Sequence, residues 1–194
     1  MTPNAESSSL ENQFLIAMPM LRDPWFAGSV SYIWQHSADG ALGIVINKPS
    51  RMKLVELFEE LNIDTSTQKN NAAMLSKLVL SGGPVEKNKG FILHESGREW
   101  EYTIPAGNGI SITMSKDILE DIALNKGPEQ YLVALGCAGW DAGQLESEIA
   151  QNAWLNAPAQ KELMFSDEHE KKAEAAAATL GISLSQLSSF AGHS

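Results

Sequence analysis

The apolar residues of the chain fall into short runs, and most of these runs have the alternation or the β-branched content of strands. Residues 30–35 and 42–46 are two such runs, and the turn-forming residues 37–40 between them predict a β-hairpin. The other expected strands are 14–17, 78–80, 90–94, 99–104, 110–113, 131–135 and 163–165, with a turn at 105–109. Strands this short and this close together favour hairpins over the long crossovers of a doubly wound parallel sheet.

Segments with helical spacing lie between the expected strands. Ser50 is a suitable N-cap, and residues 54–61 after it carry leucine and phenylalanine three and four positions apart. Further helices are expected at 115–124, after Asp141, at 167–180 and from Ser183, whereas the polar residues 62–73 predict a loop. The elements together predict an α+β fold, a single-domain α/β sandwich with a mixed, largely antiparallel sheet and several flanking helices. This domain would span residues 13–194 and follow a flexible tail at residues 1–12.

Residues 131–155 combine a strand, a turn and a helix start in one stretch. Residues 131–135 predict a buried strand, and the small residues 136–139 predict a tight turn. Asp141 and Gln144 have the three-residue spacing of a capping box, which predicts that a helix begins there. In α/β proteins a binding site often lies where a strand turns into a helix. Residues 136–148 are therefore one candidate place for a small-molecule pocket.

The charge of the chain restricts its partners. The 194 residues carry a formal net charge of −10, and a field of that sign repels nucleic acids and anionic membranes. The 14 lysines and arginines are scattered along the sequence, so no local basic patch is apparent. No window of about 18 apolar residues predicts a transmembrane helix. With its single cysteine the chain forms no intrachain disulfide, which fits a reducing compartment, so we expect a cytoplasmic protein.

Three features resemble reactive or ligand-binding sites and have simpler structural interpretations. Cys137 lies where a strand approaches a helix start, but free cysteines are most often buried packing residues. Gly82-Gly83-Pro84 could expose amides to a phosphate, yet Pro84 removes one donor and a turn explains the sequence. The four histidines share no metal-ligand spacing, and only His94 lies at a strand end. We therefore predict no catalytic residue, no metal ion and no cofactor.

The remaining candidates form a contact surface. Trp140, Gln144 and Glu148 share one helix face, which can contact a partner or anchor a buried tryptophan. The loop around Pro19 and Phe26 carries large apolar groups, which either pack inward or form an exposed patch. The candidate contact residues are Pro19, Asp23, Phe26, Asn47, Lys48, Pro49, Gly82, Gly83, Pro84, His94, Gly139, Trp140, Gln144 and Glu148.

Several motifs in a fixed order carry a family resemblance. They are FLIAMPMLRDPWFAGSV (14–30), GIVINKP (43–49), SGGPV (81–85), FILH (91–94) and GCAGWDAGQLESEIAQNAWL (136–155). With these motifs the chain resembles the AlgH/YqgE family of bacterial proteins from about Phe14 to His193. The resemblance implies a compact cytosolic α/β domain with no established catalytic activity and no catalytic residue to carry over. Many relatives have tyrosine in place of Cys137, which counts against an essential thiol.

The resemblance leaves three classes of function open. Relatives are labelled transcriptional regulators, yet the chain has no helix-turn-helix pattern and no basic recognition helix. The leading hypothesis is a regulatory or interaction protein that acts indirectly on gene expression through an unidentified protein partner or small ligand. The first alternative is a small-molecule-binding protein or enzyme with a pocket at residues 136–148. The second is a DNA-binding regulator, which the net charge of −10 disfavours. The sequence is compatible with a monomer.

Overall fold

The computed structural model describes residues 9–68 and 71–191. The strands are β1 (Gln13–Ala17), β2 (Val30–Ser37), β3 (Gly40–Val45), β4 (Pro49–Lys53), β5 (Leu78–Ser81), β6 (Val85–Glu95), β7 (Thr103–Gly107), β8 (Ile110–Thr113), β9 (Tyr131–Asp141) and β10 (Trp154–Pro158). The helices are α1 (Leu54–Glu60), α2 (Ala72–Leu75), α3 (Asp117–Ala123), α4 (Gln144–Ala150), α5 (Lys161–Phe165), α6 (Lys172–Ala178) and α7 (Leu184–Ala191), with short 3-10 turns η1 (Ser66–Gln68) and η2 (His169–Lys171).

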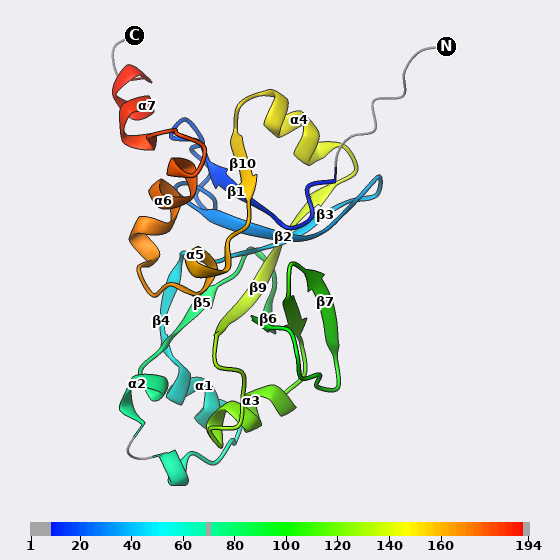
Figure 1. Cartoon of the computed structure of the whole chain (residues 1–194), viewed down its shortest axis with the longest axis vertical. Coiled ribbons are helices and arrows are strands. Elements are labelled where there is room, and N and C mark those ends of the chain that lie inside the picture. The colour runs from blue at the N-terminus through cyan, green and yellow to red at the C-terminus, as the bar shows by residue number, and fades with distance from the viewer. Residues whose placement is uncertain (1–8, 69–70, 192–194) are drawn as a thin grey trace.

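Eight strands form one curled antiparallel sheet, a half-barrel, in the order β10-β1-β2-β3-β9-β6-β8-β7. The fifth strand extends it by pairing parallel to β9, and β4 pairs antiparallel with β5. The first strand pairs with β10, so Gln13 lies opposite Pro158. The α+β class and the largely antiparallel mixed sheet agree with the sequence, but the sheet curls where a sandwich was expected. Figure 1 shows α4, α6 and α7 at one end of the molecule and α1, α2 and α3 at the other.

One strand joins the two ends of the molecule. Residues 131–135 of β9 pair with β6, and residues 138–141 pair with β3. Between them Gly136 has a φ of +79°, a conformation that glycine adopts without strain, and the strand bends there. The predicted turn at 136–139 is therefore wrong: the small residues form a bend within a strand. Position 136 requires glycine because a Cβ atom there would lie 2.5 Å from the carbonyl oxygen of Gly83.

Two buried clusters fix the helices to the sheet. At the end with α1 and α3, side chains such as Leu54, Phe58 and Ile118 pack with Val133 of β9. At the opposite end α4 packs through Leu145, which lies in a cluster with two tryptophans described below. The apolar spacing of residues 54–61 therefore predicted both the helix α1 and its buried face correctly.

Several local predictions are wrong. Ser50 lies in β4, and the N-cap of α1 is Lys53, whose backbone amide donates to Glu56. Residues 163–165 belong to helix α5 although their apolar run resembles a strand. The strand expected at 99–104 is shifted to Thr103–Gly107, which pairs with β8 and shortens the predicted turn.

Two predicted helices begin later than expected. Helix α4 begins at Gln144 after Gly143, which has a φ of +73°, and only half of the predicted capping box is present: the Asp141 amide donates to Gln144 Oε1 at 2.9 Å. The helix predicted at 167–180 is the 3-10 turn η2 followed by α6. The loop predicted at 62–73 contains η1 and the start of α2, and residues 69–70 of it lie outside the described residues.

The N-terminal residues that the structure describes before β1 contact the rest of the domain. Of the expected tail, residues 1–8 lie outside the described residues, whereas Leu10 is buried and its amide donates to His36 Nδ1 at 3.1 Å. Asn12 accepts a hydrogen bond from the Tyr32 hydroxyl at 2.8 Å. None of the helices in the described part of the chain is long and apolar enough to cross a membrane.

Lys172 of α6 is a fully buried cation. Its Nζ donates to the backbone carbonyls of Ile46 at 3.0 Å and Met164 at 2.8 Å, which ties α6 to the end of β3 and to α5. Burial lowers the pKa of Lys172 to about 8, and Asp167 opposes this shift. The two hydrogen bonds explain how an ammonium group is tolerated in the interior.

Because of Lys172 we expect the stability of the protein to rise with pH between about 8 and 10. In this window the folded protein has lost the Lys172 proton, whereas the unfolded chain, with a lysine pKa near 10.4, still binds it. The unfolded state then binds more protons, so the free energy of unfolding increases by up to about 1.4 kcal/mol per pH unit. Urea unfolding of the wild type and Lys172→Met across this range measures the effect. Parallel pH profiles for the two proteins would contradict it.

Candidate functional site

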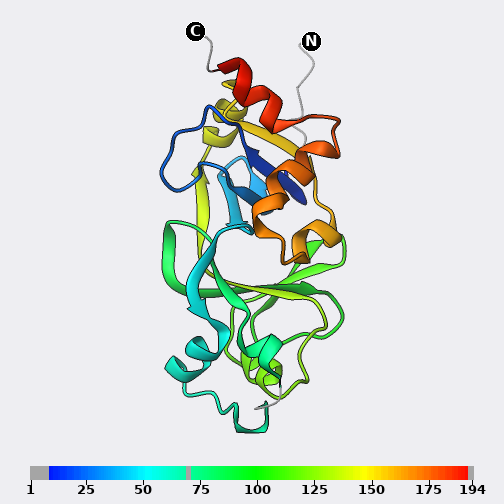
Figure 2. The same ribbon diagram turned by 90° about the vertical axis from the view of Figure 1, so that its left-hand side faces the viewer.

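Three segments far apart in the sequence meet on one side of the molecule. They are the loop at residues 18–28, the segment 47–53 that contains β4, and residues 81–89 at the start of β6; Figure 2 shows them together at the left edge, in blue, cyan and green. Two adjoining hollows of about 500 and 390 Å³ lie among them and share Trp25 and Ser81. We call their combined surface the tryptophan groove; it is lined by Pro24, Trp25, Asn47, Lys48, Pro49, Ser50, Arg51, Met52, Leu80, Ser81, Gly83, Lys87 and Leu135.

Asp23 and Phe26 hold the loop that carries Trp25. The carboxylate of Asp23 accepts from the amides of Trp25 at 2.8 Å and Phe26 at 3.0 Å, an arrangement typical of an Asx turn. The Phe26 ring lies 5.8 Å from the ring of Trp140 and 5.4 Å from that of Trp154, centre to centre. The loop is thus closed by Asp23 and anchored inward by Phe26, which leaves Trp25 beside the groove.

Asn47 and Lys48 connect the second segment to the same loop. The Asn47 side chain accepts from the amide of Val30 at 2.7 Å and donates to the carbonyl of Gly28 at 2.9 Å. The Lys48 ammonium donates to the carbonyl of Trp25. Partial burial lowers the pKa of Lys48, and the nearby Asp23 carboxylate opposes this shift. These contacts require asparagine and lysine where the sequence has them, directly after β3.

The groove combines an apolar lining with basic side chains. Met52, Leu80 and Leu135 line it, and Arg51 and Lys87 lie among them, with Lys87 Nζ 5.1 Å from the centre of the Trp25 ring. The three segments carry six lysines and arginines against Asp23 and Glu86, a net charge of +4. The rest of the chain therefore carries −14. The groove is therefore surrounded by a local basic patch, and the prediction that the chain has none is wrong.

Gly82-Gly83-Pro84 is a packed connection between β5 and β6, and Gly83 lines the groove. The Gly82 amide donates to the carbonyl of Leu135 at 2.8 Å, and the Gly82 carbonyl accepts from the amide of Val45 at 2.8 Å. Both glycines are buried. The backbone groups of Gly82 are thus used within the fold, which supports the structural interpretation of this motif over a phosphate cradle.

The face of Trp140, Gln144 and Glu148 lies behind the loop; Trp140 is buried, Glu148 is half-buried and Gln144 is exposed. Trp140 is 5% and Trp154 is 4% exposed. One oxygen of Glu148, Oε2, accepts from both indole N–H groups, at 3.1 Å from Trp140 and 2.7 Å from Trp154. The amide of Gln144 donates to the other oxygen at 2.8 Å. This group supports the loop, because the Phe26 ring contacts the rings of both tryptophans.

The other candidates lie apart from the groove lining. His94 is fully buried between Thr113 Oγ1 and the carbonyl of Glu95, both at 2.8 Å, and burial lowers its pKa. Cys137 is buried, and burial raises the pKa of its thiol, which disfavours a nucleophilic thiolate. Pro19 and Gly139 are exposed but do not line the groove. Within residues 9–68 and 71–191 no three histidine, cysteine or acidic side chains are grouped to hold a metal ion.

Comparisons with known proteins agree with the motifs. A family model described as AlgH-like matches residues 14–185. A UPF0301 protein of Xanthomonas oryzae pv. oryzae is 44% identical over 184 residues, which cover 95% of this chain and 96% of the relative. The solution structure of the AlgH protein from Pseudomonas aeruginosa has a TM-score of 0.76 and 41% identity, over 98% of both chains.

A crystal structure from Corynebacterium diphtheriae has a TM-score of 0.70 at 18% identity, over 91% of this chain and 90% of that one, and is similar in fold. The family model and the relatives above 40% identity cover nearly the whole of the described fold. The chain belongs to the AlgH-like family.

Proposed function

We propose that this protein is an interaction module that binds an acidic segment of a partner protein in the tryptophan groove. The observation that carries the proposal is the charge contrast: three segments with a net charge of +4 surround the groove in a chain whose remainder carries −14. An acidic partner is repelled by most of the surface and attracted only here. The contrast therefore favours one docking orientation as well as binding.

The side chains in the groove are of the kinds that contribute most to protein interfaces. Tryptophan and arginine are enriched among the residues that dominate binding energy, and Trp25 and Arg51 lie in the same hollow. Met52 and Leu80 provide an apolar lining for a hydrophobic side chain of the partner. Asp23, Asn47 and Lys48 hold the surrounding backbone, so the surface is formed before the partner arrives.

A regulatory role of such a module is indirect. The bound partner would carry the effect on gene expression, and the groove would select that partner by its acidic sequence. Duplex DNA is the alternative anionic ligand. Its binding would also depend on Arg51 and Lys87, so the same variants test it.

Reversing two charges of the groove is expected to abolish partner capture. We expect acidic proteins captured from a bacterial lysate by the wild type to fall at least about ten-fold with Arg51→Glu/Lys87→Glu, a loss of about 1.4 kcal/mol or more. Quantitative mass spectrometry of the captured proteins measures the change. Lys116→Glu/Lys126→Glu is the matched control, because it makes the same change in net charge at exposed positions before and after α3.

Three further results decide between interpretations. Trp25→Ala, as a separate variant, should reduce the capture of the same proteins as Arg51→Glu/Lys87→Glu does. An increase in salt concentration should release these proteins from the wild type. Equal loss in the control variant would show that net charge alone matters and would contradict the proposal. A labelled 20-base-pair duplex that binds the wild type, loses affinity with the groove variant and shows a steep salt dependence would replace the protein partner by DNA.

A further inference from the structure

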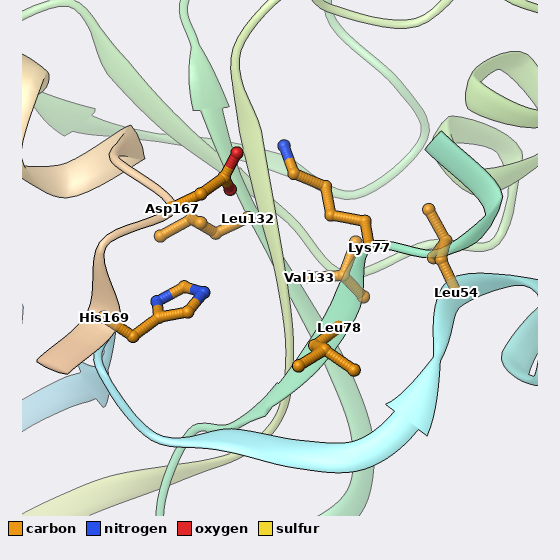
Figure 3. A pocket seen from close by; sticks show the side chains of 7 residues that line it. All are labelled: Leu54, Lys77, Leu78, Leu132, Val133, Asp167 and His169. Carbon is orange, nitrogen blue, oxygen red and sulfur yellow. The ribbon is translucent and has the colours of Figure 1, made fainter. Parts of the chain in front are cut away.

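The strand β4 lies at an edge of the sheet. Among the described residues β4 pairs only with β5, in which Leu80 lies opposite Pro49. Figure 1 shows β4 at the left margin of the molecule. Figure 3 shows it from close by, in cyan, where it runs beside β5 and reaches Leu54. The side of β4 that faces away from β5 has no strand next to it in this part of the chain.

The backbone groups of Arg51 belong to that free side. The Lys48 carbonyl accepts from the amide of Ser81, and the Leu54 amide donates to the carbonyl of β5's neighbour Lys77. Positions 48 and 54 therefore turn their backbone groups to β5. Successive residues of a strand turn alternately to its two sides, so the odd-numbered position of Arg51 faces away from β5. In agreement with this, Arg51 has no partner in the register of the two strands.

The other edges of the sheet are less suited to the addition of a strand. In the described part of the chain the sheet also ends at β7 and β10. The middle residue of β7 is Pro105, and a proline supplies no amide to a neighbouring strand. The strand β10 ends in Pro158 and contacts α4 and α6. In β4 the proline is only the first residue, and residues 50–52 after it line the tryptophan groove.

The side chains of β4 alternate between exposed charge and partial burial. Arg51 and Lys53 are exposed, and within residues 9–68 and 71–191 no ion pair contains either of them. Ser50 and Met52 are half-buried, and Met52 belongs to the apolar lining of the groove. Cations on an edge strand normally discourage pairing with other chains. An acidic strand reverses this effect, because opposite charges on neighbouring strands attract each other.

We propose that the acidic segment of the partner binds as an added β-strand along β4. Acidic residues at every second position would lie beside Arg51 and Lys53, and apolar residues between them would face the side of Met52. Backbone hydrogen bonds to the free side of β4 would supply affinity, and the two rows of side chains would supply selectivity. This inference rests on the proposed function and specifies how the groove holds the partner.

Calorimetric titration with capped six-residue peptides tests the pairing. The probe alternates glutamate and valine, and its control has three glutamates followed by three valines. We expect the alternating peptide to bind at least about ten-fold more tightly, because only alternation separates charged and apolar groups onto the two faces of a strand.

A reversal of charge tests the side-chain contacts. Arg51→Glu/Lys53→Glu should bind an alternating lysine–valine peptide more tightly than the glutamate–valine peptide, with folding checked by circular dichroism. Lys116→Glu/Lys126→Glu makes the same change in net charge away from β4 and should keep the preference of the wild type for glutamate.

Methylation of the peptide nitrogens tests the backbone contacts. In a bound strand every second residue turns its N–H group to β4, and the residues between turn theirs to solvent. We therefore expect N-methylation of one set, all glutamates or all valines, to weaken binding about ten-fold or more. N-methylation of the other set should change binding less than about two-fold.

The strand pairing is overturned if the alternating peptide does not bind, if the control peptide binds as tightly, or if both methylated sets behave alike. In that case the capture experiment with Arg51→Glu/Lys87→Glu decides the proposed function alone. If the peptides behave as expected while capture from lysate is the same for this variant and the wild type, the strand pairing stands and the proposed partner class fails.

Discussion

Replacement of Gly83 by alanine is expected to prevent stable folding of the protein. A Cβ atom at this position would lie 2.1 Å from the carbonyl oxygen of Cys137, 2.2 Å from its carbonyl carbon and 2.5 Å from the amide nitrogen of Ala138. All three are backbone atoms of β9, and this strand is paired with β6 and β3. Relief of the contact would therefore require a shift of paired strands in the middle of the sheet.

We expect Gly83→Ala to lose more than about 4 kcal/mol of unfolding free energy, in the range of severe overpacking and backbone strain. Urea unfolding followed by circular dichroism measures this loss. Gly90→Ala, in β6, is the matched control, because a Cβ there meets only the side chain of Ile92 at 3.8 Å. A Gly83→Ala protein as stable as Gly90→Ala would show that the two segments do not touch as the structure has them.

The second large effect is expected from Glu148→Leu. The Glu148 carboxylate is the acceptor for the indole N–H groups of Trp140 and Trp154, both of which are buried. Leucine keeps much of the volume but leaves two buried donors without partners, at about 1–3 kcal/mol each. The free energy of unfolding should fall by about 2–5 kcal/mol, and the melting temperature should fall with it.

Glu148→Gln separates the hydrogen bonds from the volume of the side chain. Its amide oxygen can still accept from an indole, so its loss of stability should be clearly smaller than that of Glu148→Leu. Near-ultraviolet circular dichroism reports on Trp140 and Trp154, and thermal unfolding gives the stability. If leucine and glutamine are tolerated equally, the carboxylate is not the acceptor that supports the two rings.

The sequence predicted those elements whose conformation depends on near neighbours. The hairpin of residues 30–46 and helix α1 were predicted because alternation and helical spacing express the local burial pattern. The bend at Gly136 was interpreted as a turn because the small residues 136–139 are as typical of a turn as of a bend within a strand. The approach of Gly82 and Gly83 to β9 requires glycine at position 136 within the strand, and no local pattern contains that information.

The candidate site was predicted in its parts but not as a whole. Asp23, Asn47 and Lys48 were singled out from the sequence and do hold the backbone around the groove. Trp25, Arg51 and Lys87 were not among the predicted contact residues. The cations of the groove come from segments more than thirty positions apart, so they form a patch only after β4, β5 and β6 have assembled. A search for clustered charge along the sequence does not find such a patch.

The pairing of β1 with β10 has a consequence for how the protein is made. Gln13 is translated 145 residues before Pro158, its partner in the sheet. Until then one edge of β1 carries unpaired backbone groups, and such edges invite pairing with other chains. The closing of this sheet is therefore a late, long-range step, typical of slowly folding topologies. The nascent chain therefore needs β10 before β1 has both of its neighbours in the sheet.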